Sequence, residues 1–405
     1  MPSKGLWVAG AALALVLALA WWGPGADGKP GAEAAAPAPT GAAPQFFGQT
    51  GAHAAVLAPA ARAARLQALK QNFELVDRTY CDYAASTRYP HTSRPIAEHP
   101  DQVYPNAPVT ESNPMRTGGK TSDPSVQIQS SQSRVFMASG ERVAFSLRAV
   151  DTRGGVLPMV ITRAVAAGMT GQGQRATAQV ALAFADDGSG ADAVGGDGAF
   201  GGILAPAMTG LASFNGTIRT QVDFSVNGKA GFVLFDVIYT PELPAVWAGP
   251  PREAVEDGSL VYYLKADIRT AGRYVVSGRV DDARGKPFAL ATFNDVLPAG
   301  PNEIRLTVFG KLLRDAQPAL PLTLRDVDAF LLKENVDPDR ALMPRLEGKV
   351  LTGSKHLNGD FSDDEWHSEE RSRHLEEFAK DIGLAREAMT EFDPTLPVLK
   401  SACLP

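Results

Sequence analysis

The chain has little of what catalytic and metal-binding proteins commonly use. Its 405 residues include only two cysteines and six histidines. Neither cysteine has a second cysteine or a histidine at ligand spacing, which excludes a thiolate zinc site. The sequence also has no Gly-x-Ser-x-Gly, His-Glu-x-x-His or P-loop motif. It therefore predicts no catalytic residue and no certain cofactor.

Positive charge is scarce as well. Lysine and arginine number 39 against 45 aspartates and glutamates, which gives a formal net charge of −6. Nucleic-acid binding depends on a basic patch or stripe, and none is visible, so nucleic acid is not an expected partner. Glycine and proline are abundant instead, at 39 and 30 residues. That composition fits many turns between short strands.

The chain has one long apolar run, at residues 6–22 (LWVAGAALALVLALAWW), behind Lys4. A helix needs about 17 to 25 such residues to cross a bilayer, and paired tryptophans suit its interface. Small residues suited to signal cleavage come only ten or more positions later. We expect residues 1–22 to be a single-pass anchor in the inner membrane with the body in the periplasm. The alternative is a cleaved signal peptide and a secreted or periplasmic protein.

Residues 23–51 consist almost entirely of alanine, proline and glycine. Such a composition buries too little apolar surface to offset the entropy lost on ordering. We expect a disordered tether that holds the body away from the membrane.

The two cysteines stand far apart, as Cys81 and Cys403. Outside the cytoplasm an even number of cysteines predicts a disulfide. This bond would tie the start of the body to the end of the chain and stabilise it by up to ~4–5 kcal/mol through loop-closure entropy. The alternative is two unrelated thiols.

Amphipathic helices are expected at both ends of the body. In residues 60–80 apolar side chains recur every three or four positions, and a second such stripe follows Ser362, which we expect to cap its helix. Between the first helix and residue 124 the chain is rich in proline, which favours an extended segment wrapped on a domain surface. We assign 52–124 to helix plus wrap and 341–405 to a C-terminal helical segment.

The pattern changes to a period of two from residue 126, which predicts β-strands. A Val226-Asn227-Gly228 turn between two strand patterns predicts a hairpin. We place an immunoglobulin-like β-sandwich at 125–240 and a second β-sandwich at 241–340. The expected fold is therefore mainly β, with two tandem sandwiches flanked by helices.

Four aspartates crowd a glycine-rich stretch at 184–200, here called the Asp/Gly loop. They are Asp186, Asp187, Asp192 and Asp197. Crowded carboxylates repel one another unless they are solvated or share a cation, and Ca²⁺ is the natural partner outside the cell. The alternative is a polar loop in which aspartates cap turns and glycines adopt positive φ.

The Asp/Gly loop, together with residues 306–310 and 324–327, resembles sequences of choice-of-anchor X proteins, an uncharacterised proteobacterial family of the cell envelope. The resemblance implies a β-sandwich body placed in the periplasm or at the cell surface. It implies no known reaction and transfers no catalytic residue.

Three functions stay open. The first is a membrane-tethered, non-catalytic periplasmic module that binds an envelope protein or glycan, or assembles an envelope complex. The second is a periplasmic hydrolase or glycan-active enzyme, with Asp186, Asp187 or Asp197 acting beside His91 or His99; a glycosidase needs two carboxyls ~5–9.5 Å apart. The third is a calcium-stabilised adhesin-like protein. The sequence does not identify the ligand.

Overall fold

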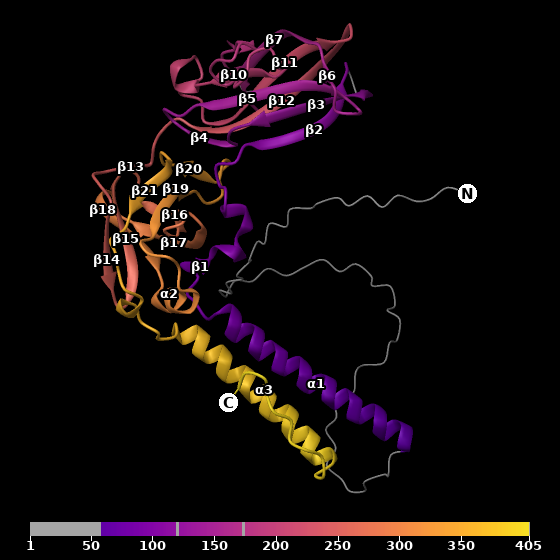
Figure 1. Cartoon of the computed structure of the whole chain (residues 1–405), viewed down its shortest axis with the longest axis vertical. Coiled ribbons are helices and arrows are strands. Elements are labelled where there is room, and N and C mark those ends of the chain that lie inside the picture. Colours follow the sequence, from indigo (N-terminus) through magenta and orange to yellow (C-terminus); the bar gives the residue numbers. More distant parts are fainter. Residues whose placement is uncertain (1–57, 119–120, 172–174, 405) are drawn as a thin grey trace, which may run out of the picture. The chain divides into compact units, whose positions relative to one another are not determined.

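The computed structural model describes residues 58–118, 121–171 and 175–404. The predicted anchor (1–22) and tether (23–51) lie outside the described residues. Among the helices that are described, none combines the length and hydropathy needed to cross a bilayer. From residue 59 onward the chain forms one unit by its internal contacts, and this unit is mainly β. Most of its helices and strands are labelled in Figure 1.

The first β unit is a sheet that folds over on itself. Its strands follow the order β8-β7-β11-β12-β2-β3-β5-β10-β9, with β4 added to β12 and β6 to β5. These strands are β2 (Val109–Arg116), β3 (Ser122–Gln132), β4 (Phe136–Ala138), β5 (Val143–Asp151), β6 (Val156–Leu157), β7 (Met159–Gly168), β8 (Val180–Ala181), β9 (Phe184–Ala185), β10 (Phe200–Leu204), β11 (Gly216–Val226) and β12 (Lys229–Thr240).

One ring contact and one weak seam show the fold-over. Phe145 of β5 stacks on Phe235 of β12 at 4.6 Å between ring centroids, although β2 and β3 separate these strands within the sheet. Among the described residues one pair, Phe232 with Arg116, joins β12 to β2. The layer β8-β7-β11-β12 therefore faces the layer β2-β3-β5-β10-β9 across one apolar core.

The predicted hairpin is confirmed. Asn227 and Gly228 connect β11 to β12 with φ values of 51° and 74°. Both central residues of this tight turn need positive φ, which asparagine and glycine tolerate.

The second β unit has two sheets that share one apolar core. One has the order β1-β17-β16-β19-β20, with β21 also on β19, and in the other β13, β14 and β18 all pair with β15. The strands are β1 (Ser93–Pro95), β13 (Ala245–Trp247), β14 (Arg252–Glu256), β15 (Ser259–Ile268), β16 (Gly272–Asp281), β17 (Pro287–Leu297), β18 (Gly300–Val308), β19 (Thr323–Leu332), β20 (Arg340–Leu342) and β21 (Leu346–Thr352), with helix α2 (Gly310–Ala316) after β18.

Two strand boundaries differ from the sequence expectation. The first sheet begins with β2, which lies within the range assigned to the proline-rich wrap. The sequence pattern does not reveal this edge strand, because Met115 is its only buried residue and no apolar–polar alternation marks it. Strand β21 lies within the range assigned to the C-terminal helical segment. The sequence pattern does not reveal this strand, because none of its residues is fully buried.

The proline-rich segment lies along the second β unit. After short 3₁₀ turns at Ile96–Glu98 and Pro100–Gln102, it continues to Asn106, whose side chain donates to Asp326 at 3.0 Å. Strand β1 pairs with the edge of β17. The segment is thus a structural wrap on the second unit.

The two long helices, α1 (Pro59–Ser86) and α3 (Glu369–Phe392), lie side by side and antiparallel (Figure 1). Arg62 near the start of α1 pairs with Asp393 just after α3 at 2.5 Å. Tyr83 near the end of α1 packs edge-on against Phe378 at 5.3 Å. The predicted apolar stripe of α1 packs mainly on α3, with Phe73 buried against it.

The predicted cap of the C-terminal helix is wrong. Ser368, not Ser362, caps α3 by accepting a hydrogen bond from the backbone N–H of Arg371. Ser362 is held instead by the second β unit, where its N–H donates to the carbonyl oxygen of Gly258 at 2.9 Å.

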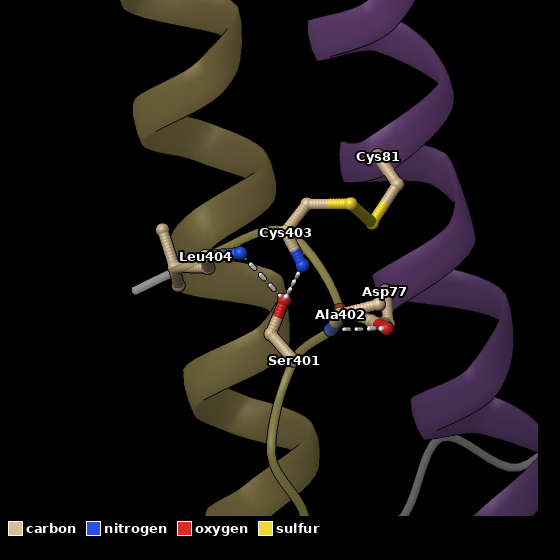
Figure 2. Close-up of a disulfide and its surroundings, with 6 residues drawn as sticks. All are labelled: Asp77, Cys81, Ser401, Ala402, Cys403 and Leu404. Carbon is tan, nitrogen blue, oxygen red and sulfur yellow. Dashed lines mark hydrogen bonds between the residues drawn. A yellow bond between two sulfur atoms is a disulfide. The ribbon is translucent and has the colours of Figure 1, made fainter.

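A disulfide joins Cys81 of α1 to Cys403, as predicted (Figure 2). The chain turns back after α3, and the backbone N–H of Ala402 donates to Asp77 of α1 at 3.1 Å. A disulfide of this kind belongs to an oxidising, non-cytoplasmic compartment.

Candidate functional site

The Asp/Gly loop brings three of its four aspartates together. Carboxylate oxygens of Asp186, Asp192 and Asp197 lie within 4.8 Å of one another. Asp187 is not part of this cluster, and it accepts hydrogen bonds from the backbone N–H and hydroxyl of Ser189.

Backbone amides already satisfy much of this cluster. Asp186 accepts from the N–H groups of residues 196–198 at 2.6 to 3.2 Å. Asp192, which is 7% exposed, accepts from Gly188 at 2.6 Å. Such bonds are also what the alternative of capped turns expects. A calcium site here stays a prediction.

The loop lies on the outward face of β10. Gly201 pairs directly with Ser146 of β5. A Cβ added at Gly201 would lie 2.5 Å from the backbone nitrogen of Asp192, so only glycine allows the loop this close approach. The loop therefore lies beside the outward side chains of β5.

Next to the loop the sheet surface is hollowed by a groove of about 500 Å³, here called the polar groove. Every lining residue except one alanine is polar. The lining residues are Thr110, Glu111, Ser112, Gln129, Ser130, Ser131, Ser146, Arg148 and Ala199.

The register explains how these residues meet. In β5 the side chains of Val143, Phe145 and Leu147 are buried, so the alternate residues point outward. Directly paired residues share a face, which gives two outward rows across β2, β3 and β5. The rows are Ser112–Gln129–Arg148 and Thr110–Ser131–Ser146.

Most hydrogen-bonding capacity in the groove is unused. Arg148 Nε donates to Gln129 Oε1 at 2.7 Å, which fixes the plane of the guanidinium. Within the described part of the chain, the two Nη nitrogens of Arg148 make no hydrogen bond or ion pair. The same holds, over the described ranges, for the hydroxyl groups of Thr110, Ser112, Ser131 and Ser146. The groove thus offers an oriented cation among uncommitted hydroxyls.

The histidines proposed as partners of these acids lie in the wrap on the second β unit. The carbonyl oxygen of His91 accepts from Thr292 of β17, and His99 stands between the two 3₁₀ turns. Neither histidine belongs to the carboxylate cluster found among the described residues.

Sequence reasoning missed a buried charge network under the wrap. Asp281, the last residue of β16, is 3% exposed and pairs with Arg279 at 2.9 Å. Arg279 in turn donates to the carbonyl oxygen of Val103 in the wrap. Burial raises the pKa of Asp281, and the neighbouring arginines only partly oppose this. Both residues alternate with the core residue Val280 and so lie on the outward face of β16, where the wrap covers them.

The next residue, Asp282, shapes the turn that follows β16. Its carboxylate accepts from the backbone N–H groups of Arg284 and Lys286 at 2.8 and 2.9 Å, and so closes the turn between β16 and β17.

Neither a protein-family model nor a curated protein matches the chain. Among solved structures, it is similar to a DUF4785 family protein from Legionella pneumophila, at 12% identity, with 56% of this chain and 57% of that chain covered and a TM-score of 0.37. It is also similar to the BSP domain of a biofilm associated protein, at 14% identity over 58% and 31% of the two chains, with a TM-score of 0.16.

A third similar structure is Escherichia coli alpha-2-macroglobulin in its native conformation. The identity is 12%, the coverage 60% of this chain and 15% of that chain, and the TM-score 0.27. The matched part is below two thirds of each of the three solved chains. The choice-of-anchor X resemblance stays a prediction.

Proposed function

We propose that the protein is a non-catalytic periplasmic binding module, tethered to the inner membrane by its N-terminal segment, and that its ligand binds the polar groove. One observation carries the proposal. The groove gathers a fixed guanidinium and four uncommitted hydroxyls on one sheet face, where a polar ligand can satisfy them.

The rest of the chain suits such a module. The disulfide fits the periplasm, and α1 begins at Pro59, shortly after the predicted tether ends at residue 51. The strand order of the second β unit, with β18 beside β15 and facing β17-β16-β19-β21, supports the proposed immunoglobulin-like assignment.

A calcium-stabilised adhesin-like protein is the second candidate. The proximity of Asp186, Asp192 and Asp197 favours it, and their bonds to backbone amides weaken it. Calcium-dependent thermal unfolding distinguishes the two candidates.

The test of the first candidate is photo-crosslinking in intact cells. A benzophenone amino acid replaces Ser131, in the centre of the groove, in the full-length chain. The matched control replaces Gln221, an exposed residue on the outward face of β11 in the other layer. We expect an envelope component attached at residue 131 and absent at residue 221. Equal labelling at both positions, or none at either, would contradict a binding role for the groove.

A further inference from the structure

The last residues of the chain turn back after α3 and lie against both long helices (Figure 2). Residues 394–404, here called the C-terminal strap, contain no helix or strand. Leu399 and Leu404 of the strap pack against the apolar contact between α1 and α3, which includes Phe73 and Ile382. Most other residues of the strap are exposed, and Val398 is 71% exposed. The strap therefore covers an apolar surface through two leucines.

Few other bonds hold the C-terminal strap in place. Arg386 of α3 donates a hydrogen bond to the carbonyl oxygen of Leu399 at 2.9 Å, and the N–H of Ala402 donates to Asp77 of α1 at 3.1 Å. Within the described part of the chain, these are the two hydrogen bonds that join the strap to the helices. The disulfide from Cys403 to α1 is thus the main tie.

The helix pair itself does not depend on that tie. Arg62 of α1 pairs with Asp393 at 2.5 Å, and Tyr83 packs on Phe378 at 5.3 Å, so contacts near both ends of α1 hold α3 beside it. Asp393, where the strap begins, is therefore fixed near α1 without the disulfide. In the folded chain the bond closes only the short loop from Asp393 to Cys403, and breaking it can open that loop alone.

The disulfide is also accessible to a second thiol. Cys403 is exposed, whereas Cys81 is half-buried in α1. Thiol–disulfide exchange requires access of a thiolate to one sulfur, and exposed disulfides are the ones that are readily reduced. In an oxidising compartment the reductant has to be a dedicated dithiol protein.

The exchange proceeds in two balanced steps. A thiolate of the dithiol protein attacks Sγ of Cys403, the Cys81 sulfur leaves as a thiolate and takes up a proton, and a mixed disulfide forms. The second thiol of the dithiol protein, as a thiolate, then attacks its own sulfur in the mixed disulfide and releases Cys403, which is protonated in turn. The dithiol protein is oxidised to a disulfide, and this chain gains two electrons and two thiols.

From these observations we infer that the bond between Cys81 and Cys403 is a redox switch. A dithiol protein reduces it in the folded chain, the C-terminal strap leaves the helix pair, and the apolar surface around Phe73 and Ile382 becomes exposed. The inference is independent of the polar groove, because none of the residues that line the groove belongs to the strap or to α1 and α3.

The test is limited trypsin digestion of the purified full-length chain in detergent, before and after reduction by thioredoxin without denaturant. Lys400 in the strap reports its release, and Lys380, an exposed lysine within α3, reports unfolding of that helix. Digests are stopped and fully reduced before mass spectrometry, so that a cut after Lys400 is counted in both states. We expect this cut to be at least tenfold faster in the reduced chain, with cleavage after Lys380 unchanged.

Variants separate the switch from a general loss of stability. The double variant Cys81→Ser/Cys403→Ser should be cut after Lys400 as fast as the reduced wild type, with or without thioredoxin. Leu399→Ala weakens the hold on the strap and keeps both cysteines, so thioredoxin should reduce it severalfold faster than wild type. Its matched control, Val398→Ala, changes an exposed neighbour and should leave the reduction rate unchanged.

Three results would overturn the inference. If thioredoxin reduces the bond only after urea has unfolded the chain, the disulfide is structural. If cleavage after Lys400 is equally fast in the oxidised and reduced chains, reduction does not release the strap. If cleavage after Lys380 rises together with cleavage after Lys400, reduction unfolds the helix pair instead of opening the strap.

Discussion

Arg148 and Gln129 are directly paired residues on neighbouring strands, and the guanidinium Nε donates to the amide oxygen at 2.7 Å. The bond joins two outward side chains on the face opposite the apolar core. It fixes the plane of the guanidinium and leaves the edge that carries both Nη nitrogens for a ligand. The arrangement links the strand register to the proposed binding chemistry.

Alanine substitutions at Gly201 and Gly383 should change the free energy of unfolding in opposite directions. A Cβ at Gly201 meets backbone at 2.5 Å, so Gly201→Ala must displace the Asp/Gly loop and should cost about 1–3 kcal/mol. Gly383 lies within α3 with open space around it, so Gly383→Ala should stabilise by about 0.5–1 kcal/mol. Urea unfolding of both variants checks this. A neutral Gly201→Ala would mean that the loop does not lie on β10.

The Asp/Gly loop should depend on Asp186 even without a metal. Asp186 accepts from three backbone amides, whereas among the described residues Asp187 bonds to Ser189 alone. We expect Asp186→Ala to lower the unfolding temperature in EDTA by several degrees, and Asp187→Ala to have a smaller effect.

Added Ca²⁺ tests the predicted ion site in the same measurement. A calcium-dependent rise for wild type that Asp192→Asn abolishes would establish the site. Unchanged temperatures would show that the backbone amides hold the loop by themselves. Equal losses for Asp186→Ala and Asp187→Ala would contradict the bonding described here.

The disulfide should stabilise the helix pair. Cys81 and Cys403 are 322 residues apart, and loop-closure entropy alone allows up to ~5 kcal/mol. Contacts such as Phe73 on Ile382 also hold α1 to α3, so we expect part of this amount. Cys81→Ala/Cys403→Ala should unfold at lower temperature, and dithiothreitol should lower the wild-type temperature only. A reduced wild type as stable as the oxidised protein would contradict this role.

Tyr274 predicts an alkaline loss of stability. Its buried hydroxyl lies 3.0 and 2.7 Å from the carbonyl oxygens of Pro244 and Thr270. Burial raises the pKa of Tyr274 from about 10 to about 12. Because the folded pKa exceeds the unfolded one, this contribution is complete below pH 10 and is lost as the pH rises to 12.

The comparison with Tyr274→Phe isolates that contribution. At pH 7 the variant should be about 1 kcal/mol less stable, because it lacks the hydroxyl bonds. The gap between wild type and variant should narrow between pH 10 and pH 12 in urea unfolding. A gap that stays constant over this range would show that Tyr274 does not titrate as described.

Local patterns predicted the elements that have a strong chemical signature. The apolar stripe of α1, the Asn227-Gly228 turn and the pairing of Cys81 with Cys403 were all visible in the sequence. Each of these features depends on spacing along the chain or on residue type, and both can be read from a single sequence. The edge strand β2 was missed, because its side chains are solvent-exposed and carry no alternation.

The polar groove could not be predicted. Ser131 of β3 is an ordinary outward residue, as are Ser146 and Arg148 of β5, and only the register brings the two strands' residues side by side. The charge pair of Arg279 and Asp281 was missed for a related reason, since its burial depends on the wrap that packs over it. Long-range pairing, rather than composition, creates both features.

The most direct test of the binding claim is to fill the polar groove and measure photo-crosslinking from residue 131. Ser146→Phe places a large ring on the outward face of β5, opposite the core. Its control is Gln221→Phe on the outward face of β11. We predict that Ser146→Phe reduces the labelled envelope component at least fivefold and that Gln221→Phe leaves it unchanged. Undiminished labelling in the folded Ser146→Phe variant would show that the ligand does not bind in the groove.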